Sequence, residues 1–235
     1  MKTLHPMKLS DRTTRILRNL LKINRSIKIK QGNQLSTLSI QKNVLASTEV
    51  EEIFPREFAI YDLDEFLTIC SLSEQSTDLE FENESYVTIR GRDSEAKYFF
   101  ADPSIVVSPP EKLPTLPSVE CEFDIELRQL SSISKAIGAY RNTEDFSIIG
   151  KDGKIIILVA DLENPSSNTF AVTVGKTNAC FQFNLKTENL EKLETMSHIS
   201  HYHVQVSKSG VSRWVSSDNV TYLIALEPDS TYEED

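Results

Sequence analysis

Five cations crowd into the fifteen residues at positions 8 to 22, which read KLSDRTTRILRNLLK. They stand against one acid, Asp11, in a chain whose formal net charge is −10. The group consists of Lys8, Arg12, Arg15, Arg18 and Lys22. Cations without acidic partners are suited to bind a polyanion, either a nucleic acid or an anionic membrane. The alternative is a solvated helix face, although such a face usually mixes both signs of charge at i,i+4 spacing.

A helix over these residues would gather the cations on one side. At about 100° of rotation per residue, four of the five cations fall within a stripe roughly 80° wide, with Arg18 at its margin. The opposite side collects Leu9, Thr13, Ile16, Leu17, Leu20 and Leu21. This pattern predicts an amphipathic helix whose apolar face lies in a core, and Ser10 is placed to cap its amino end.

Two other groups of residues could in principle support enzyme chemistry. The run Gly175-Lys176-Thr177 resembles the end of a phosphate-binding loop, but the pattern GxxxxGK[ST] requires glycine at the position of Phe170. Asp62 and Asp64 could bind a divalent ion. Helix capping and a favourable interaction with the helix dipole explain both aspartates more simply. No GxSxG or GxGxxG pattern is present, so we expect neither an enzyme nor a cofactor.

Histidines near the carboxyl end could contribute to a metal site. His201 and His203 would share one face of a strand, and His198 lies just before them. No acid or cysteine at ligand spacing joins them, so a solvated strand is the simpler interpretation and we expect no metal.

Composition limits the class of protein. The 235 residues are 39% hydrophobic and 26% charged, enough for one large domain or two of about 110 residues. No apolar run approaches the roughly 18 residues of a membrane span, so we expect a soluble intracellular protein without a membrane partner. Cys70, Cys121 and Cys180 are read as reduced core thiols. A sequence pI near 5.0 confines any contact with nucleic acid to one face.

The chain repeats its layout on either side of a proline-rich stretch. Residues 103–117 hold five of the nine prolines, a density that blocks helix and interior strand alike. Each half reads as two helices and a run of antiparallel strands, which predicts an α+β fold with two similar domains. The predicted boundaries are 7–102 and 118–230 for the domains, with 103–117 as the linker.

Turn and helix-capping residues predict where individual helices and strands lie. In the first half, Gly32-Asn33 predicts a turn pairing the first two strands, and Asp62 is placed to cap a second helix over 63–72. The second half should hold helices over 126–137 and 187–194.

Several segments resemble the sliding clamps of T-even-type bacteriophages, the processivity factors of their replicative DNA polymerases. They are MKLS (7–10), FAIYDLDEFLTICSL (58–72), FFADPSIVV (99–107) and LIALEPDST (223–231). The order is the same from Met7 to the carboxyl end, and residues 1–6 have no counterpart, so either Met1 or Met7 could be the start. No one segment is a functional signature, and the resemblance rests on their collinearity.

The resemblance implies the sliding-clamp fold, in which each protomer has two similar domains and three protomers close into a ring around duplex DNA. The implied partners are double-stranded DNA of any sequence, two further copies of the chain, the replicative DNA polymerase and an ATP-driven clamp loader. The implied location is the cytoplasm of the infected host bacterium. Whether late-transcription factors also use the clamp stays open. The alternative function is a sequence-nonspecific DNA-binding accessory module that does not encircle DNA.

Two sets of site residues follow. The DNA-facing set is Lys8, Arg12, Arg15, Arg18, Lys22, Arg128 and Lys135. Its last two members are seven apart on the predicted helix 126–137, and the other two predicted helices are mostly acidic. Short polymerase tails bind near the interdomain linker in the resembling family, which implies a partner-binding set of Ile105, Val106, Val107, Leu226 and Pro228. The alternative is that the valines only pin the linker to a sheet.

Overall fold

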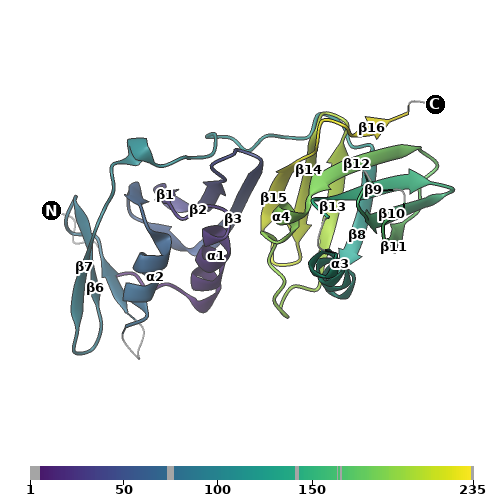
Figure 1. Ribbon diagram of the computed structural model, residues 1–235. Coiled ribbons are helices and arrows are strands. Elements are labelled where there is room, and N and C mark those ends of the chain that lie inside the picture. The colour runs from purple at the N-terminus through teal and green to yellow at the C-terminus, as the bar shows by residue number, and fades with distance from the viewer. Residues whose placement is uncertain (1–5, 73–76, 141–142, 163, 165, 234–235) are drawn as a thin grey trace. The chain divides into compact units, whose positions relative to one another are not determined.

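The computed structural model describes residues 6–72, 77–140, 143–162, 164 and 166–233. The chain forms two compact units, Met1–Lys112 and Leu113–Asp235, and the division falls inside the proline-rich stretch 103–117. Figure 1 shows helices and antiparallel strands in both units, the predicted α+β class. No helix in the described ranges is long and apolar enough to cross a membrane.

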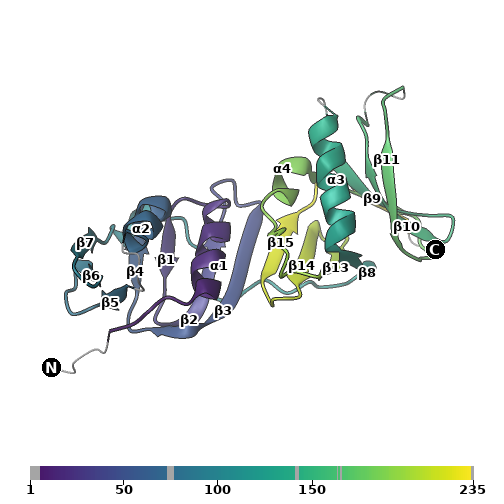
Figure 2. The same ribbon diagram turned by 90° about the horizontal axis from the view of Figure 1, so that it is seen from below.

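The first unit combines two helices with short antiparallel sheets. Its helices are α1 (Asp11–Leu21) and α2 (Leu63–Cys70), which lie side by side in both views (Figure 2). Its strands are β1 (Ile27–Ile29), β2 (Gly32–Leu38), β3 (Val44–Phe54), β4 (Phe58–Ile60), β5 (Asp78–Glu80), β6 (Tyr86–Arg90) and β7 (Glu95–Phe99). β1 pairs with β4, β2 with β3, and β5, β6 and β7 form a three-stranded sheet. A 3-10 turn, Pro103–Ile105, begins the proline-rich stretch.

The predicted hairpin at Gly32-Asn33 is wrong. Gly32 has φ +114° and opens β2, whose antiparallel partner is the eleven-residue β3. β1 pairs instead with β4, so that Ile27 and Ile29 lie opposite Ile60 and Phe58. These four side chains are almost completely buried, and their burial is the physical reason for that pairing.

The second unit holds two sheets and two helices. Its helices are α3 (Leu127–Ala139) and α4 (Thr187–Leu190). Its strands are β8 (Cys121–Glu126), β9 (Asp145–Lys151), β10 (Lys154–Val159), β11 (Phe170–Gly175), β12 (Phe181–Lys186), β13 (His201–Ser207), β14 (Val211–Ser216), β15 (Thr221–Ala225) and β16 (Thr231–Tyr232). One sheet has the order β11-β10-β9-β12-β16, and β15, β14, β13 and β8 lie in that order in the other. β11 is therefore an end strand.

The helix predicted over 187–194 is shorter than expected. α4 ends at Leu190, and the next turn is tightened by bonds from Lys192 N to the Asn189 carbonyl and from Leu193 N to the Leu190 carbonyl. Leu190 and Leu193 are both buried, so a tight turn satisfies the apolar positions without a longer helix.

Candidate nucleic-acid interface

The apolar face of α1 anchors the cation-bearing helix in the first unit. Ile16, Leu17 and Leu20 are at most 1% exposed, as the amphipathic pattern predicted. The Ser10 hydroxyl accepts a hydrogen bond from Thr13 N at 3.2 Å, which confirms the predicted amino cap. Because Ser10 is the cap, Lys8 precedes the helix, and its predicted place in the helical stripe is wrong.

A buried carboxylate on β3 holds the beginning of α1. Glu52 Oε1 accepts from Ser10 N and Glu52 Oε2 accepts from the Thr13 hydroxyl, both at 2.5 Å. Burial raises the pKa of Glu52, but hydrogen bonds from the Ser10 backbone and the Thr13 hydroxyl outweigh it and lower the pKa below its usual value. The sequence interpretation missed Glu52, although the alternation of buried Val50, Glu52 and Phe54 is a signal that could have found it.

The cations of α1 differ in exposure. Arg12 is half-buried and donates to the Glu49 carbonyl at 2.9 Å, and Arg15 is half-buried as well. Arg18 and Lys22 are exposed, and neither makes an ion pair with any residue that the structure describes. The helix carries one acid, Asp11, in its first turn. Its solvent side is therefore strongly positive and can attract phosphates through long-range Coulomb forces.

Lys8 lies apart from that helix surface. Its ammonium group is 3.7 Å from Asp78 Oδ1 on β5, and its side chain is 58% exposed. A contact of this kind between exposed groups is weak.

α3 carries the two DNA-facing candidates of the second unit, Arg128 and Lys135. Leu130, Ile133 and Ala136 bury one face of the helix. Arg128 and Lys135 are both exposed. The Arg128 guanidinium, however, is paired with the Glu126 carboxylate, Nε to Oε2 at 2.6 Å. The positive charge of Arg128 is therefore partly neutralised by Glu126.

The other two helices contribute little positive charge. Asp62 caps α2 by accepting from Asp64 N at 3.1 Å and Glu65 N at 3.2 Å. The bond from Glu65 N is the main reason that the pKa of Asp62 is lowered, and a 2.8 Å ion pair with Arg25 adds to it. The aspartate is thus a helix cap, as expected. On the turn after α4, the Lys192 ammonium donates to Asn189 Oδ1 at 3.0 Å.

The five partner-binding candidates are divided between the two units. Ile105 is 59% exposed, whereas Val106 is 6% exposed and Val107 is half-buried. In the second unit, Leu226 is 9% exposed and Pro228 is exposed. The burial of Val106 agrees with the alternative that the valines only hold the linker against a sheet. The role of these five residues in partner binding stays a prediction.

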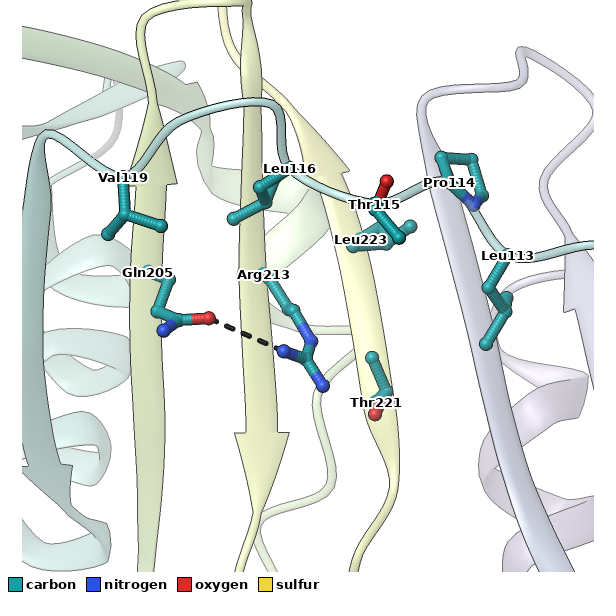
Figure 3. Close-up of a pocket in the computed structure, with 9 residues that line it drawn as sticks. All are labelled: Leu113, Pro114, Thr115, Leu116, Val119, Gln205, Arg213, Thr221 and Leu223. Atoms are coloured by element: carbon teal, nitrogen blue, oxygen red, sulfur yellow. Dashed lines mark hydrogen bonds between the residues drawn. The ribbon is translucent and has the colours of Figure 1, made fainter.

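A groove in the second unit lies beneath the segment that leads into β8 (Figure 3). Its volume is about 320 Å³, and it contains none of the five candidates. Its walls are Leu113, Pro114, Thr115, Leu116 and Val119 from the segment, Gln205 from β13, Arg213 from β14, and Thr221 and Leu223 from β15. The strand register puts Gln205 and Leu223 on either side of Arg213. A concave, largely apolar surface with a few polar groups is typical of a binding site.

His203 and His198 make separate contacts. His203 lies 3.0 Å from Glu122 Oε1 and 2.9 Å from Asp124 Oδ1, whereas the His198 ring lies 3.3 Å from Glu194 Oε1. Among the described residues, no group of three or more histidines, cysteines or acids is arranged to hold a metal ion.

The glycine at the end of β11 does not open a phosphate-binding loop. Gly175 ends β11, and the next element is strand β12. A phosphate-binding loop leads into a helix, whose amino end holds the phosphates.

Comparison with protein families and sequences gives one consistent answer. Residues 8–108 match the family described as DNA polymerase processivity factor. The sliding clamp of Vibrio phage KVP40 is 29% identical over 227 residues, covering 94% of this chain and 99% of the relative. The sliding clamp of Enterobacteria phage T4 is 28% identical over 234 residues, covering 97% of this chain and 100% of the relative.

Comparison with solved structures assigns the fold. A. fulgidus PCNA, in a structure with the C-terminal region of FEN-1, gives a TM-score of 0.68 at 14% identity and covers 93% of this chain and 96% of its own. The Helicobacter pylori beta clamp, in a structure with a DNA ligase peptide, gives 0.68 at 13% identity and covers 97% of this chain and 67% of its own. The fold is thus the clamp fold, and the family match together with the full-length relatives supports a sliding clamp of the T4 bacteriophage type, a DNA polymerase processivity factor.

Proposed function

We propose that this processivity factor closes as a homotrimeric ring around duplex DNA and holds the replicative DNA polymerase on its template. The observation that carries the proposal is the cationic outer side of α1 in a chain of net charge −10. A protein that slides past every sequence needs numerous weak phosphate contacts, because base-reading contacts would stop it. Positive charge on one surface and negative charge elsewhere directs DNA to that surface alone.

The proposed DNA-facing residues come from both units. They are Lys8, Arg12, Arg15, Arg18, Lys22, Arg128 and Lys135. The exposed ends of Arg18 and Lys22 support phosphate contact directly, since no described carboxylate competes for them. Arg128 would have to leave Glu126 in order to reach a phosphate.

Ring closure requires an unlike contact between neighbouring subunits, repeated three times. β11 is a candidate for that contact, since it ends the five-stranded sheet and its sequence, FAVTVG, contains no charge and no proline. Edge strands of monomeric proteins usually carry a charged residue or a proline, which prevents pairing with another chain. We propose that β11 pairs with a strand of the next subunit.

Polymerase docking is proposed for the face near the proline-rich stretch. Ile105, Val106, Val107, Leu226 and Pro228 remain candidates, and the groove beneath residues 113–119 adds a concave surface. The A. fulgidus clamp binds the C-terminal region of FEN-1 and the H. pylori clamp binds a DNA ligase peptide, which supports a peptide-binding role here. An ATP-driven loader would open the ring, and the protein would work in the cytoplasm of the infected bacterium.

A topological experiment tests the ring. The clamp is loaded onto a nicked circular plasmid, the excess protein is removed, and the DNA is then cut once with a restriction enzyme. A ring should stay on the circle and slide off the linear product. Equal retention on circle and linear DNA would overturn the proposal and favour a DNA-binding module that does not encircle. Sedimentation at several concentrations should give a mass near three times 26.6 kDa.

A further inference from the structure

Three lysines gather at one end of the five-stranded sheet, and none of them belongs to the proposed DNA-facing set. They are Lys151 on β9, Lys154 on β10 and Lys176 directly after β11. All three are exposed, and none makes an ion pair with a residue that the structure describes. Lys151 and Lys154 lie directly opposite each other in the β9–β10 register, where like charges destabilise a sheet. An anion close to these lysines would relieve that repulsion.

The turn between β9 and β10 does not itself require the lysines. Asp152 and Gly153 have φ angles of 52° and 77°, as a two-residue hairpin turn needs, and Asp-Gly is a preferred pair there. Thr177 N donates to the Gly153 carbonyl at 3.3 Å, which holds the segment after β11 against the same turn. The three cations therefore share one small surface. We call the surface formed by Lys151, Lys154 and Lys176 the lysine patch.

Acidic residues after β16 lie at the same end of this sheet. β16 pairs with β12, and β12 pairs with β9. Glu233 N, one residue past β16, donates to the carbonyl of Cys180, one residue before β12, at 3.0 Å. The same register, continued onto β9, reaches Lys151. Two strand spacings, about 10 Å in total, therefore separate Glu233 from Lys151. Glu234 and Asp235 follow in the sequence, outside the described residues.

The segment that leads to these acids is fixed on β12. Asn184 N donates to the Ser230 hydroxyl at 2.9 Å, and the Asn184 side-chain amide donates to Asp229 Oδ2 at 2.9 Å. The Lys208 ammonium lies 5.6 Å from the centre of the Tyr232 ring. Each further residue advances by at most about 3.6 Å, so the two residues after position 233 can span about 7 Å. The long lysine side chains cover the distance that remains.

We propose that the acids at positions 233–235 lie over the lysine patch and shield it from DNA. The three acids match the three lysines in number and are opposite in sign. Because they are attached to the same chain, their effective concentration at the patch is high. Uncovered, the patch would attract phosphates to a second surface, whereas a covered patch leaves the DNA to the cations of α1. This contact lies outside the proposed DNA-facing set and does not depend on ring closure.

The test measures binding of a short linear DNA duplex to the full-length clamp at low salt, without a loader, by fluorescence anisotropy. An acid-neutral variant carries Glu233→Gln, Glu234→Gln and Asp235→Asn. It should bind the duplex about threefold to tenfold more tightly than wild type, since the uncovered lysines contact phosphates. A matched control removes the same charge from exposed positions of the first unit and should tighten binding by less than about twofold. It carries Glu82→Gln, Glu84→Gln and Glu111→Gln.

Substitution of the lysines tests whether the gain comes from the patch. Lys151→Gln, Lys154→Gln and Lys176→Gln together should abolish the gain of the acid-neutral variant. In the wild-type chain the same three changes should alter binding by less than about twofold, because the acids already cover the lysines. A lysine effect of equal size in both chains would overturn the proposal, since additive effects mean that the two groups do not interact. Equal gains in the acid-neutral variant and its control would overturn it too, because net charge alone would then explain them.

Chemical cross-linking tests the contact itself. A carbodiimide joins a carboxylate to an amine only where the two groups meet, and peptide mass mapping identifies the joined residues. In the wild-type clamp, residues 233–235 should be linked to the lysine patch. Links to Lys208 alone would place the acids elsewhere and contradict the proposal.

Discussion

α1 and α3 are the two cation-bearing helices, one in each unit. Each buries three apolar side chains at helical spacing, and each begins with a side-chain hydrogen bond at its first turn. Their outer sides differ, since Arg18 and Lys22 are not paired with described acids whereas Arg128 is held by Glu126. The two helices therefore share the way they pack against their units, whereas the charge that they expose to solvent differs.

Substitutions on the buried faces of α1 and α3 should have the largest effects on stability, and the effects should be similar in the two helices. Leu17 and Leu130 are both 0% exposed, so Leu17→Ala and Leu130→Ala should each lower the free energy of unfolding by about 2–5 kcal/mol. Urea denaturation followed by circular dichroism measures both. Leu21→Ala, at a half-buried position of α1, should cost less. A cost below about 1 kcal/mol for either buried leucine would show that its helix is not held by this face.

Sequence periodicity could predict these inner faces because it reports which residues are buried, but it does not report which strands pair. The spacing of Ile16, Leu17 and Leu20 defined the buried side of α1, and Ser10 its beginning. The partner of β1 could not be read, since alternation in Ile27 and Ile29 is satisfied by any apolar strand. The groove was missed because Leu116 and Arg213 are almost a hundred residues apart and become neighbours only through the sheet.

Substitutions of the exposed cations should affect retention on DNA differently in the two helices. Arg18→Gln with Lys22→Gln removes two unpaired cations from α1, and Arg128→Gln with Lys135→Gln removes two from α3. Retention on circular DNA at low salt should fall at least about tenfold in the α1 variant and clearly less in the α3 variant, because fewer counterions are released from DNA. Folding should hardly change, since exposed substitutions shift stability by less than about 0.5 kcal/mol each.

A matched control removes two exposed cations elsewhere. Lys151→Gln with Lys154→Gln changes the β9–β10 turn and should leave retention near the wild-type value. The gap between wild type and the α1 variant should narrow as salt rises, because screening weakens every phosphate contact. Equal losses in all three double variants would mean that net charge alone matters and that α1 has no special place.

The amino end of α1 should respond to pH through Glu52. The folded-state pKa of Glu52 is lowered, so its contribution to stability is fully present above its unfolded value of 4.5 and is lost as pH falls through the folded pKa. Glu52→Gln keeps one acceptor and should cost about 1–3 kcal/mol at pH 7. The difference from wild type should shrink below about pH 4.5. Denaturation at pH 7 and pH 3 measures it, with exposed Glu51→Gln as the control. A gap that is the same at both pH values would contradict this role.

The smallest expected effect is the most informative, because it tests why α3 should contribute less than α1 to retention on DNA. Glu126→Gln frees Arg128 from its partner but keeps an oxygen at the beginning of the helix. Stability should change by less than about 1 kcal/mol, since the pair is exposed. If Arg128 faces DNA, retention at low salt should rise about twofold and the salt dependence should steepen, as one more cation per subunit becomes available to phosphates. Glu122→Gln removes a negative charge from the same strand without releasing an arginine, so it measures the general effect of charge. Equal retention in these two variants would mean that the ion pair does not restrain Arg128, and that the difference between α1 and α3 lies in their position.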